Sequence, residues 1–170
     1  WIIFGGADPD AWTATAVPLP AGPVPSYFGY RIVGAGDVNG DGIEDFAVSS
    51  QSAVYLYFGA SNGAQLAGPA VKLALGASSF PEVIRAGNFD GEGPADLLIG
   101  DYTAIGRFGA AWIVLGRPAG SWPVEIALGL VRADNDGLGV MAFEGNALDS
   151  TGAQVGWLGS FCAGNDGRSD

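Results

Sequence analysis

Short apolar runs that close on glycine recur along the chain. Three of them align: Trp1-Ile2-Ile3-Phe4-Gly5, Tyr55-Leu56-Tyr57-Phe58-Gly59 and Trp112-Ile113-Val114-Leu115-Gly116. Successive copies are 54 and 57 residues apart. Apolar runs of this length, rich in aromatic and β-branched residues and bounded by glycine, predict buried β-strands.

A second, weaker apolar pattern moves along the chain with the first. It reads Val17–Gly22, Val71–Gly76 and Val124–Gly129, at steps of 54 and 53 residues. Two patterns that shift together indicate an internal repeat of about 50 residues. We expect each copy of this second pattern to form the last strand of its repeat.

The third pattern is polar, and an apolar strand follows its first two copies. Asp37-Val38-Asn39-Gly40-Asp41-Gly42-Ile43-Glu44-Asp45 precedes Phe46–Val48, and Asn88-Phe89-Asp90-Gly91-Glu92-Gly93-Pro94-Ala95-Asp96 precedes Leu97–Ile99. A partial third copy reads Asn165-Asp166-Gly167-Arg168-Ser169-Asp170. Each repeat therefore reads as strand, Asp-rich loop, strand, turn, aromatic strand and weaker fourth strand.

Four short strands per repeat predict an all-β chain of antiparallel propeller blades. Residues 26–78 make one whole blade, and residues 79–149 make a second blade with an insertion in which Val140–Phe143 adds a strand. Residues 1–25 supply the back half of a blade, and residues 150–170 supply the front half of another. We therefore expect a partial propeller, whose ends are covered by the remaining blades of a longer chain or by a protein partner.

Composition narrows the classes of partner. Glycine contributes 29 of 170 residues, which fits many tight turns between short strands. The formal net charge of −11 argues against nucleic acid and anionic lipid as partners. No apolar run approaches the roughly 20 residues of a membrane-spanning helix, so no membrane span is predicted.

The acids gather in the polar loops, where their spacing fits calcium. Calcium takes six to eight hard oxygen ligands, and alternate loop positions can turn such side chains inward around a glycine turn. In the first loop the predicted ligands are Asp37, Asn39, Asp41, the carbonyl of Ile43, and Asp45. The alternative is that the Asn-Gly and Asp-Gly pairs are ordinary turn residues.

The other two loops depart from this pattern. In the second loop the corresponding ligands are Asn88, Asp90, Glu92, the carbonyl of Pro94, and Asp96. In the third loop Asp166 and Asp170 keep their places, but Cys162 and Gly164 stand where oxygen ligands are expected. Calcium is therefore best supported at the first loop.

Together these motifs resemble FG-GAP repeats, the blades of integrin-α-like β-propellers that are also common in bacterial surface and secreted proteins. The resemblance rests on Phe28-Gly29, on the loop Gly36–Gly42, on Asp45–Val48 and on Tyr57-Phe58-Gly59. It implies calcium in the loop between the first two strands of a blade, and an extracellular, cell-surface or periplasmic location. Ser49-Ser50-Gln51 and Ser79-Phe80 depart from the usual motif.

Catalysis is not expected in this chain. It has no histidine and a single cysteine, Cys162, so Ser-His-Asp and Cys-His chemistry are excluded. We expect a binding, adhesion or scaffolding module; the alternatives are a non-catalytic domain attached to a secreted hydrolase and a structural subunit of a larger complex. Carbohydrate stays open as a ligand through Trp12 and Trp122, whereas Trp1 and Trp112 are expected to pack between blades.

Overall fold

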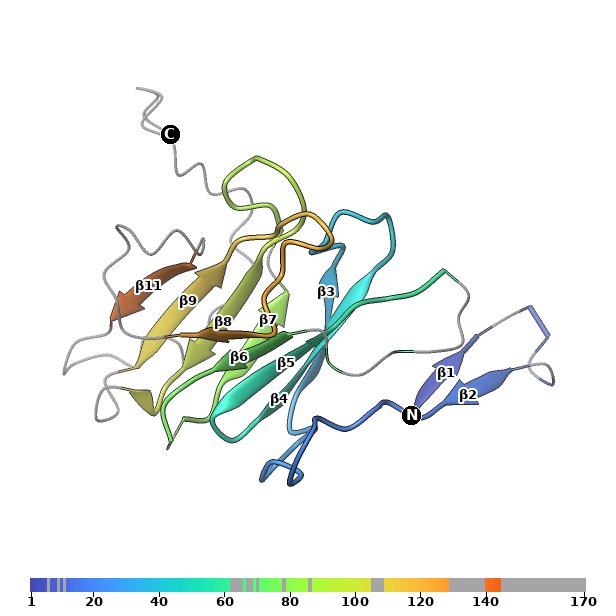
Figure 1. Cartoon of the computed structure of the whole chain (residues 1–170), viewed down its shortest axis with the longest axis horizontal. Helices are drawn as coiled ribbons and strands as arrows, with labels where there is room; N and C mark the ends of the chain where they lie inside the picture. Colours follow the sequence, from blue (N-terminus) through green and yellow to red (C-terminus); the bar gives the residue numbers. More distant parts are fainter. Residues whose placement is uncertain are drawn as a thin grey trace.

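The computed structural model describes residues 1–5, 7–8, 10, 12–61, 66, 69, 71–77, 79–85, 87–104, 109–128 and 140–144. All the elements with described bounds are β-strands, which confirms the all-β class (Figure 1). No helix in the same ranges is long and apolar enough to cross a bilayer.

The strands form three sheets. Their bounds are β1 (Ile2–Phe4), β2 (Thr13–Thr15), β3 (Ile32–Gly36), β4 (Asp45–Ser50), β5 (Ala53–Tyr57), β6 (Val71–Ala74), β7 (Glu82–Arg85), β8 (Leu97–Asp101), β9 (Ala110–Val114), β10 (Glu125–Ala127) and β11 (Val140–Glu144). The hairpin β1–β2 stands alone, a five-stranded sheet has the order β10-β6-β5-β4-β3, and a four-stranded sheet has the order β11-β9-β8-β7. The described strands do not close into a ring (Figure 1).

The two larger sheets contain the same antiparallel unit, because β3-β4-β5 and β7-β8-β9 run through equivalent parts of the repeat. In each unit the first two strands flank an Asp loop. The third strand is the aromatic one, and β5 and β9 are buried along their whole length. Burial on both faces explains why these strands are continuously apolar instead of alternating.

The fourth strands differ from expectation. β10 was expected beside β9, but it pairs in parallel with β6 of the other sheet, with Ile126 opposite Leu73. Ile126 is buried there in the same apolar cluster as Leu73, and the exposed pair Lys72–Glu125 (3.3 Å) flanks them. The place beside β9 is taken by β11, so the strand expected within the insertion is confirmed.

The segment Val17–Gly22 does not form the expected strand. Pro18 and Pro20 have no backbone N–H to donate to a neighbouring strand, which disfavours a place inside a sheet. β2, immediately before this segment, is the strand that pairs with β1.

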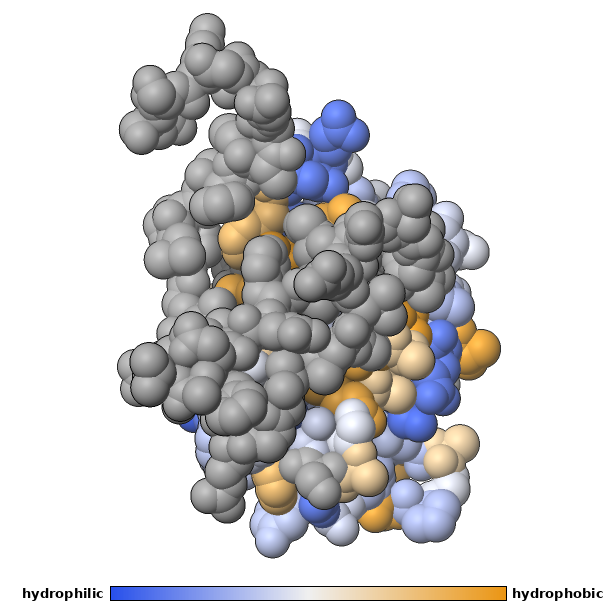
Figure 2. Space-filling view, turned by 90° about the vertical axis from the view of Figure 1, so that its left-hand side faces the viewer, coloured by the Kyte–Doolittle hydropathy of each residue, from blue (hydrophilic) through white to orange (hydrophobic). Residues whose placement is uncertain are grey.

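The main core lies between the two larger sheets and draws on both. Its fully buried members include Val54, Leu56 and Leu73 from one sheet and Ile99 and Val114 from the other. The face of the molecule seen in Figure 2 is mixed, with hydrophobic and hydrophilic residues interspersed wherever it is not grey.

The first Asp loop also contacts the second repeat through its backbone. Three successive carbonyls of the loop accept hydrogen bonds from N–H groups of the second repeat: Asp37 from Ala95 (2.9 Å), Val38 from Arg117 (3.1 Å) and Asn39 from Ala119 (2.7 Å). An ion pair between Arg31 and Glu82 (3.0 Å) joins the two repeats as well. The first loop therefore belongs structurally to both repeats.

Replacing Arg117 with proline tests this junction, because proline removes the N–H that the Val38 carbonyl accepts. Val38 is buried, so we expect the free energy of unfolding to fall by about 1–3 kcal/mol relative to Arg117→Ala. Arg117→Ala also removes the side chain but keeps the N–H, which makes it the matched control. Urea unfolding of both variants provides the measurement, and equal stabilities would contradict the prediction.

Candidate metal centre

The carboxylate of Asp37 organises the first loop. Its Oδ1 accepts hydrogen bonds from the N–H groups of Gly40 (2.7 Å) and Asp41 (3.0 Å), and its Oδ2 accepts one from Gly42 (2.8 Å). The loop turns back on this carboxylate through two glycines with positive φ, Gly40 at 72° and Gly42 at 87°. The sequence therefore uses glycine where the chain must curl around the first acid.

The next two polar side chains repeat the arrangement at shorter range. Asn39 Oδ1 accepts the N–H of Asp41 (2.8 Å), and Asp41 Oδ1 accepts the N–H of Ile43 (2.8 Å). These are Asx turns, in which a side-chain oxygen binds the backbone two residues further on. The Asn39 amide also donates to Asp41 Oδ2 (3.0 Å), so the side chains at loop positions three and five meet.

Asp45, the last acid of the loop, connects the loop to the end of the aromatic strand. Asp45 is buried, and its two oxygens accept the N–H groups of Val38 (2.9 Å) and Gly59 (2.8 Å). Burial raises the pKa of Asp45 to about 6; the two N–H groups oppose this shift, and the charges of Asp41 and Asp37 add to it. One carboxylate thus ties the start of the loop to the glycine that ends the aromatic strand.

The second repeat contains the same connection. Asp96 is buried and accepts the N–H groups of Phe89 and of Gly116, the latter at 2.8 Å. Burial raises the pKa of Asp96 as well, against the effect of the N–H groups that it binds. We call the pairs Asp45–Gly59 and Asp96–Gly116 the Asp–Gly clamps.

Each clamp explains why its strand must end on glycine. A Cβ on Gly59 would lie 2.4 Å from the carbonyl oxygen of Glu44, and a Cβ on Gly116 would lie 2.4 Å from that of Ala95. The loop backbone sits so close that no side chain fits. The glycine that ends the aromatic strand is therefore required for the loop backbone to pack against that strand.

Away from its clamp, the second loop is less organised. The Asn88 amide donates to the Gly93 carbonyl (3.1 Å), where Asp37 of the first loop accepts three N–H groups. Asp90 Oδ1 accepts the N–H of Glu92 (2.9 Å), and both of these side chains are exposed. Pro94 lies at position seven beside the first loop, because a Cβ on Gly40 would be 3.2 Å from its Cγ.

The residues of the first loop fit calcium better than those of the second. Across the described ranges, no three His, Cys, Asp or Glu side chains gather into one cluster. The first loop instead brings together two carboxylates, Asp37 and Asp41, and the amide of Asn39, all with hard oxygens. Asp45, the fifth predicted ligand, is buried, and both of its oxygens accept N–H groups, as both oxygens of Asp37 do. Asp166 and Asp170 of the third loop lie outside the described residues.

Comparison with known families decides the class of these repeats. Residues 37–99, which span both Asp loops and the strands between them, match the FG-GAP-like repeat family. The chain contains an FG-GAP-like repeat. Such repeats form blades of β-propellers, and the two larger sheets have the antiparallel strands that a blade requires. No curated protein matches the chain.

A buried acid outside the FG-GAP loops was not anticipated from the sequence. Asp101 is fully buried at the end of β8, where its Oδ1 accepts the N–H (2.8 Å) and the hydroxyl (2.6 Å) of Thr103. Its Oδ2 has no hydrogen-bond partner among the described residues. The first repeat has Ser50 at the equivalent place, so the signal was an acid that interrupts the repeat at the end of an apolar strand.

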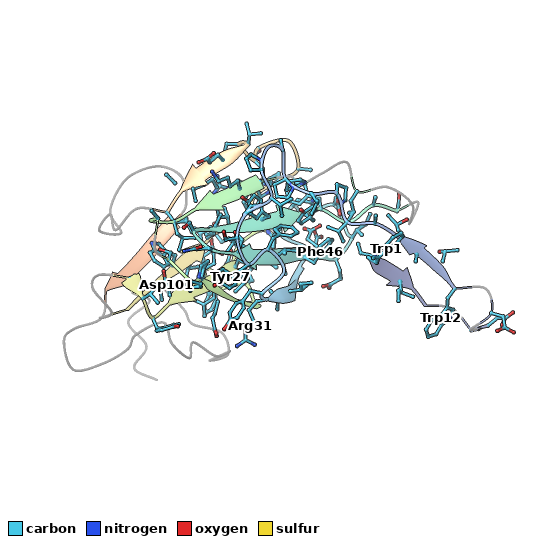
Figure 3. All side chains as sticks on the ribbon, turned by 90° about the horizontal axis from the view of Figure 1, so that it is seen from below. Trp1, Trp12, Tyr27, Arg31, Phe46 and Asp101 are labelled. Atoms are coloured by element: carbon cyan, nitrogen blue, oxygen red, sulfur yellow. The ribbon has the colours of Figure 1, made fainter. Side chains whose placement is uncertain are left out.

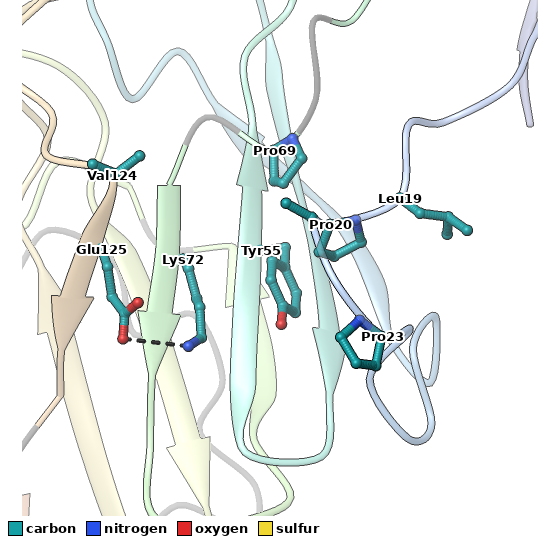
Figure 4. Close-up of a pocket in the computed structure, with 9 residues that line it drawn as sticks. Leu19, Pro20, Pro23, Tyr55, Pro69, Lys72, Val124 and Glu125 are labelled. Carbon is teal, nitrogen blue, oxygen red and sulfur yellow. Dashed lines mark hydrogen bonds and ion pairs between the residues drawn. The ribbon is translucent and has the colours of Figure 1, made fainter.

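A cavity of about 640 Å³ opens beside the outer face of the five-stranded sheet (Figure 4). Pro20 and Pro23 form one wall, and Tyr55 lies between them and the ion pair of Lys72 with Glu125. This cavity cannot be predicted from the sequence, because it depends on the positions of β10 and of the proline-rich segment Pro18–Pro23 in the fold.

Of the tryptophans expected to make exposed contacts, only Trp12 is largely exposed, at 52%. Trp122 is partly buried: its indole N–H donates to the Arg117 carbonyl (2.9 Å), and its ring packs edge-on against Phe58. Trp112 is buried as expected, but Trp1 is 83% exposed, contrary to expectation.

The clamp predicts a large effect of Asp45→Ala, measured in chelator so that no ion contributes. Two buried N–H groups lose their acceptor at once, so we expect a loss of at least about 2 kcal/mol in the free energy of unfolding. Glu92→Ala removes an equal charge at an exposed site and should change stability by no more than about 0.5 kcal/mol. Chemical denaturation of the two variants compares them, and similar losses would argue against the clamp.

Proposed function

We propose that this chain is a calcium-binding FG-GAP β-propeller module that serves as an extracellular binding, adhesion or scaffolding domain without a catalytic centre of its own. The observation that carries the calcium part is the first loop, where consecutive turns hold Asp37, Asn39 and Asp41 on one short stretch of backbone. FG-GAP repeats often bind calcium, which supports the same assignment.

The chemistry of the loop favours calcium over transition metals and magnesium. Its donors are carboxylate, amide and carbonyl oxygens, and the chain has no histidine to attract zinc or copper. A flexible loop with neutral as well as charged oxygens suits the larger ion, because magnesium demands a tighter octahedral shell. Asp37, Asn39, Asp41, Asp45 and the Ile43 carbonyl would hold the ion, and Asp45 also joins the loop to Gly59.

Calcium at this place would act on the junction between the repeats. The carbonyls of Asp37, Val38 and Asn39 accept hydrogen bonds from the second repeat. An ion that holds the side chains of Asp37 and Asn39 in place also fixes this stretch of backbone and therefore the angle between the blades. A scaffold needs this rigidity, since binding surfaces on loops depend on a fixed frame.

A role in binding is supported by the absence of histidine from the sequence and by the character of the described surface. The lining of the described cavity includes one carboxylate, Glu125, and this group is paired with Lys72. Exposed aromatic residues are present on the described surface, among them Tyr27, Tyr30 and Trp12. Such side chains favour contacts with proteins or carbohydrate. The partner we propose is a protein, including further blades of the same propeller.

Thermal unfolding with calcium and with chelator tests the calcium site. Extracellular calcium modules have dissociation constants of about 0.1–1 mM, and a tenfold excess over that value stabilises the folded state by about 1.4 kcal/mol. We expect calcium to raise the melting temperature and Asp41→Ala to abolish most of the increase. Glu44→Ala removes an equal charge at a loop position that is not a predicted ligand, and the increase should persist.

Magnesium at the same concentration should give a smaller increase than calcium. A melting temperature that does not change with calcium would refute the calcium site, and an equal loss in Asp41→Ala and Glu44→Ala would refute the ligand assignment. Isothermal titration of the wild-type chain and Asp41→Ala gives the same comparison as an affinity.

A further inference from the structure

Asn39 is followed directly by Gly40, and this pair has a chemistry of its own besides metal binding. In an Asn-Gly pair the backbone nitrogen of glycine can attack the side-chain carbonyl carbon of asparagine, because glycine has no side chain to obstruct the approach. A bond forms between Gly40 N and Asn39 Cγ, the bond from Cγ to Nδ2 breaks, and ammonia leaves with the proton of the attacking nitrogen. The product is a cyclic imide, which water then opens.

Three restraints oppose this reaction in the structure. The N–H of Gly40 donates to Asp37 Oδ1 (2.7 Å), and the charge of this acceptor holds the proton on the attacking nitrogen. The Asn39 carboxamide is fixed at both of its polar atoms, because Oδ1 accepts the N–H of Asp41 (2.8 Å) and Nδ2 donates to Asp41 Oδ2 (3.0 Å). Asn39 is also only 2% exposed, which limits the access of water and base. The ordered loop therefore keeps its own Asn-Gly pair unreactive.

Water can open the imide on either side, and the two products differ in their backbone. Attack at Cγ leaves an ordinary aspartate at position 39. Attack at the main-chain carbonyl carbon leaves isoaspartate, in which the backbone runs through the former side chain and is longer by a methylene group. The former main-chain carbonyl group is then a free carboxylate.

The second loop shows what an ordinary aspartate does at this position. Asp90 corresponds to Asn39, and it also precedes a glycine, Gly91. Its Oδ1 accepts the N–H of Glu92 (2.9 Å), which is the turn that Asn39 makes with Asp41. An aspartate at position three therefore keeps the local turn, and isoaspartate is the product that changes the structure.

Asn39 also belongs to the junction between the repeats. Its main-chain carbonyl accepts the N–H of Ala119 at 2.7 Å. In isoaspartate this oxygen is no longer part of a peptide group, and the added methylene group shifts the rest of the loop relative to the second repeat. The modification therefore acts on the contact between the repeats as well as on the loop.

The opposite end of the sheets joins the repeats independently of the loop. There Arg31 pairs with Glu82 (3.0 Å), and the ring of Tyr27 packs edge-on against Phe80. Figure 3 shows Tyr27 and Arg31 apart from Phe46, the residue of β4 that closely follows the loop. Loss of the loop contacts would loosen one end of the junction without separating the repeats.

We propose that Asn39 is a modification site, at which opening of the first loop leads to deamidation, and that the isoaspartate formed there uncouples the loop from the second repeat. The reaction needs only water and releases ammonia, so an uncoupled loop does not return to its original state by closing again. The restraints are hydrogen bonds of the chain itself. An experiment in chelator therefore tests this proposal separately from the calcium site proposed above.

The rate of deamidation at Asn39 provides the test, measured by peptide mass spectrometry in chelator for the native chain and for the same chain unfolded in urea. We expect a rate at least about tenfold lower in the native chain, because only the open fraction of the loop reacts. Asp37→Ala removes the acceptor of the Gly40 N–H and should raise the native rate by about tenfold. Glu44→Ala removes an equal charge from the same loop and should leave the rate within about twofold of wild type.

A measurement on the wild type alone covers the case in which Asp37→Ala does not fold. Urea is raised to concentrations below those that unfold the chain, and the amide hydrogen exchange of Gly40 is followed by NMR. Because exchange and deamidation both require an open loop, the rate of deamidation at Asn39 should rise in proportion to the exchange rate of Gly40.

The effect on the junction is measured on chain that has been allowed to deamidate. In molecules with isoaspartate at position 39, the amide exchange of Ala119 should be at least about tenfold faster than in the unmodified chain. The exchange of Gly59, whose N–H is bound by Asp45, should not change. Asn39→Asp has the ordinary backbone and should leave the exchange of Ala119 within about twofold of wild type.

Each part of the proposal has a result that overturns it. Equal rates of deamidation in the native and the unfolded chain would show that the loop does not restrain Asn39. Equal rates in Asp37→Ala and Glu44→Ala would show that the Asp37 carboxylate is not the restraint. Unchanged exchange of Ala119 in the isoaspartate form would show that the modification does not reach the junction.

Discussion

The structure depends on a buried carboxylate that joins a loop to a strand it does not adjoin in sequence. Asp45 binds the N–H groups of Val38 and Gly59, and Asp96 does the same in the second repeat. Ionised carboxylates are costly to bury, and the raised pKa of both groups reflects that cost. The two N–H bonds offset part of it, and the fixed loop can then present its other oxygens outward.

Much of this arrangement could be predicted from the sequence, because it recurs. The Asp loops, the strands that follow them and the glycines that close the aromatic runs shift together along the chain, and shared spacing is a stronger signal than local propensity. Asp45 was identified as part of the loop in this way. Its hydrogen bond to Gly59 was not, since nothing in a sequence states which backbone N–H a carboxylate will reach.

The features that could not be predicted are those in which a strand has more than one possible neighbour. The residues around Ile126 have the pattern of a buried strand, but the pattern does not say which sheet contains that strand. In the structure Ile126 lies opposite Leu73 of β6, so the strand joins the five-stranded sheet. Around Pro18 the repeat pattern was misleading, because apolar periodicity ignores the lost N–H of proline. Asp101 was missed because it belongs to no Asp loop, and the only signal is that an acid replaces Ser50 of the first repeat at the end of an apolar strand.

The backbone contacts between the repeats give the array a direction. At the junction, carbonyl oxygens of the first loop accept hydrogen bonds from N–H groups of the second repeat, which belong to Ala95, Arg117 and Ala119. Each repeat therefore has an acceptor side and a donor side, which are different surfaces. Units that join head to tail in this way grow in one sense only, and such a series ends when it closes on itself or meets a cap. Because the acceptor side of one blade must meet the donor side of the next, blades of this kind can add to one another in one orientation only.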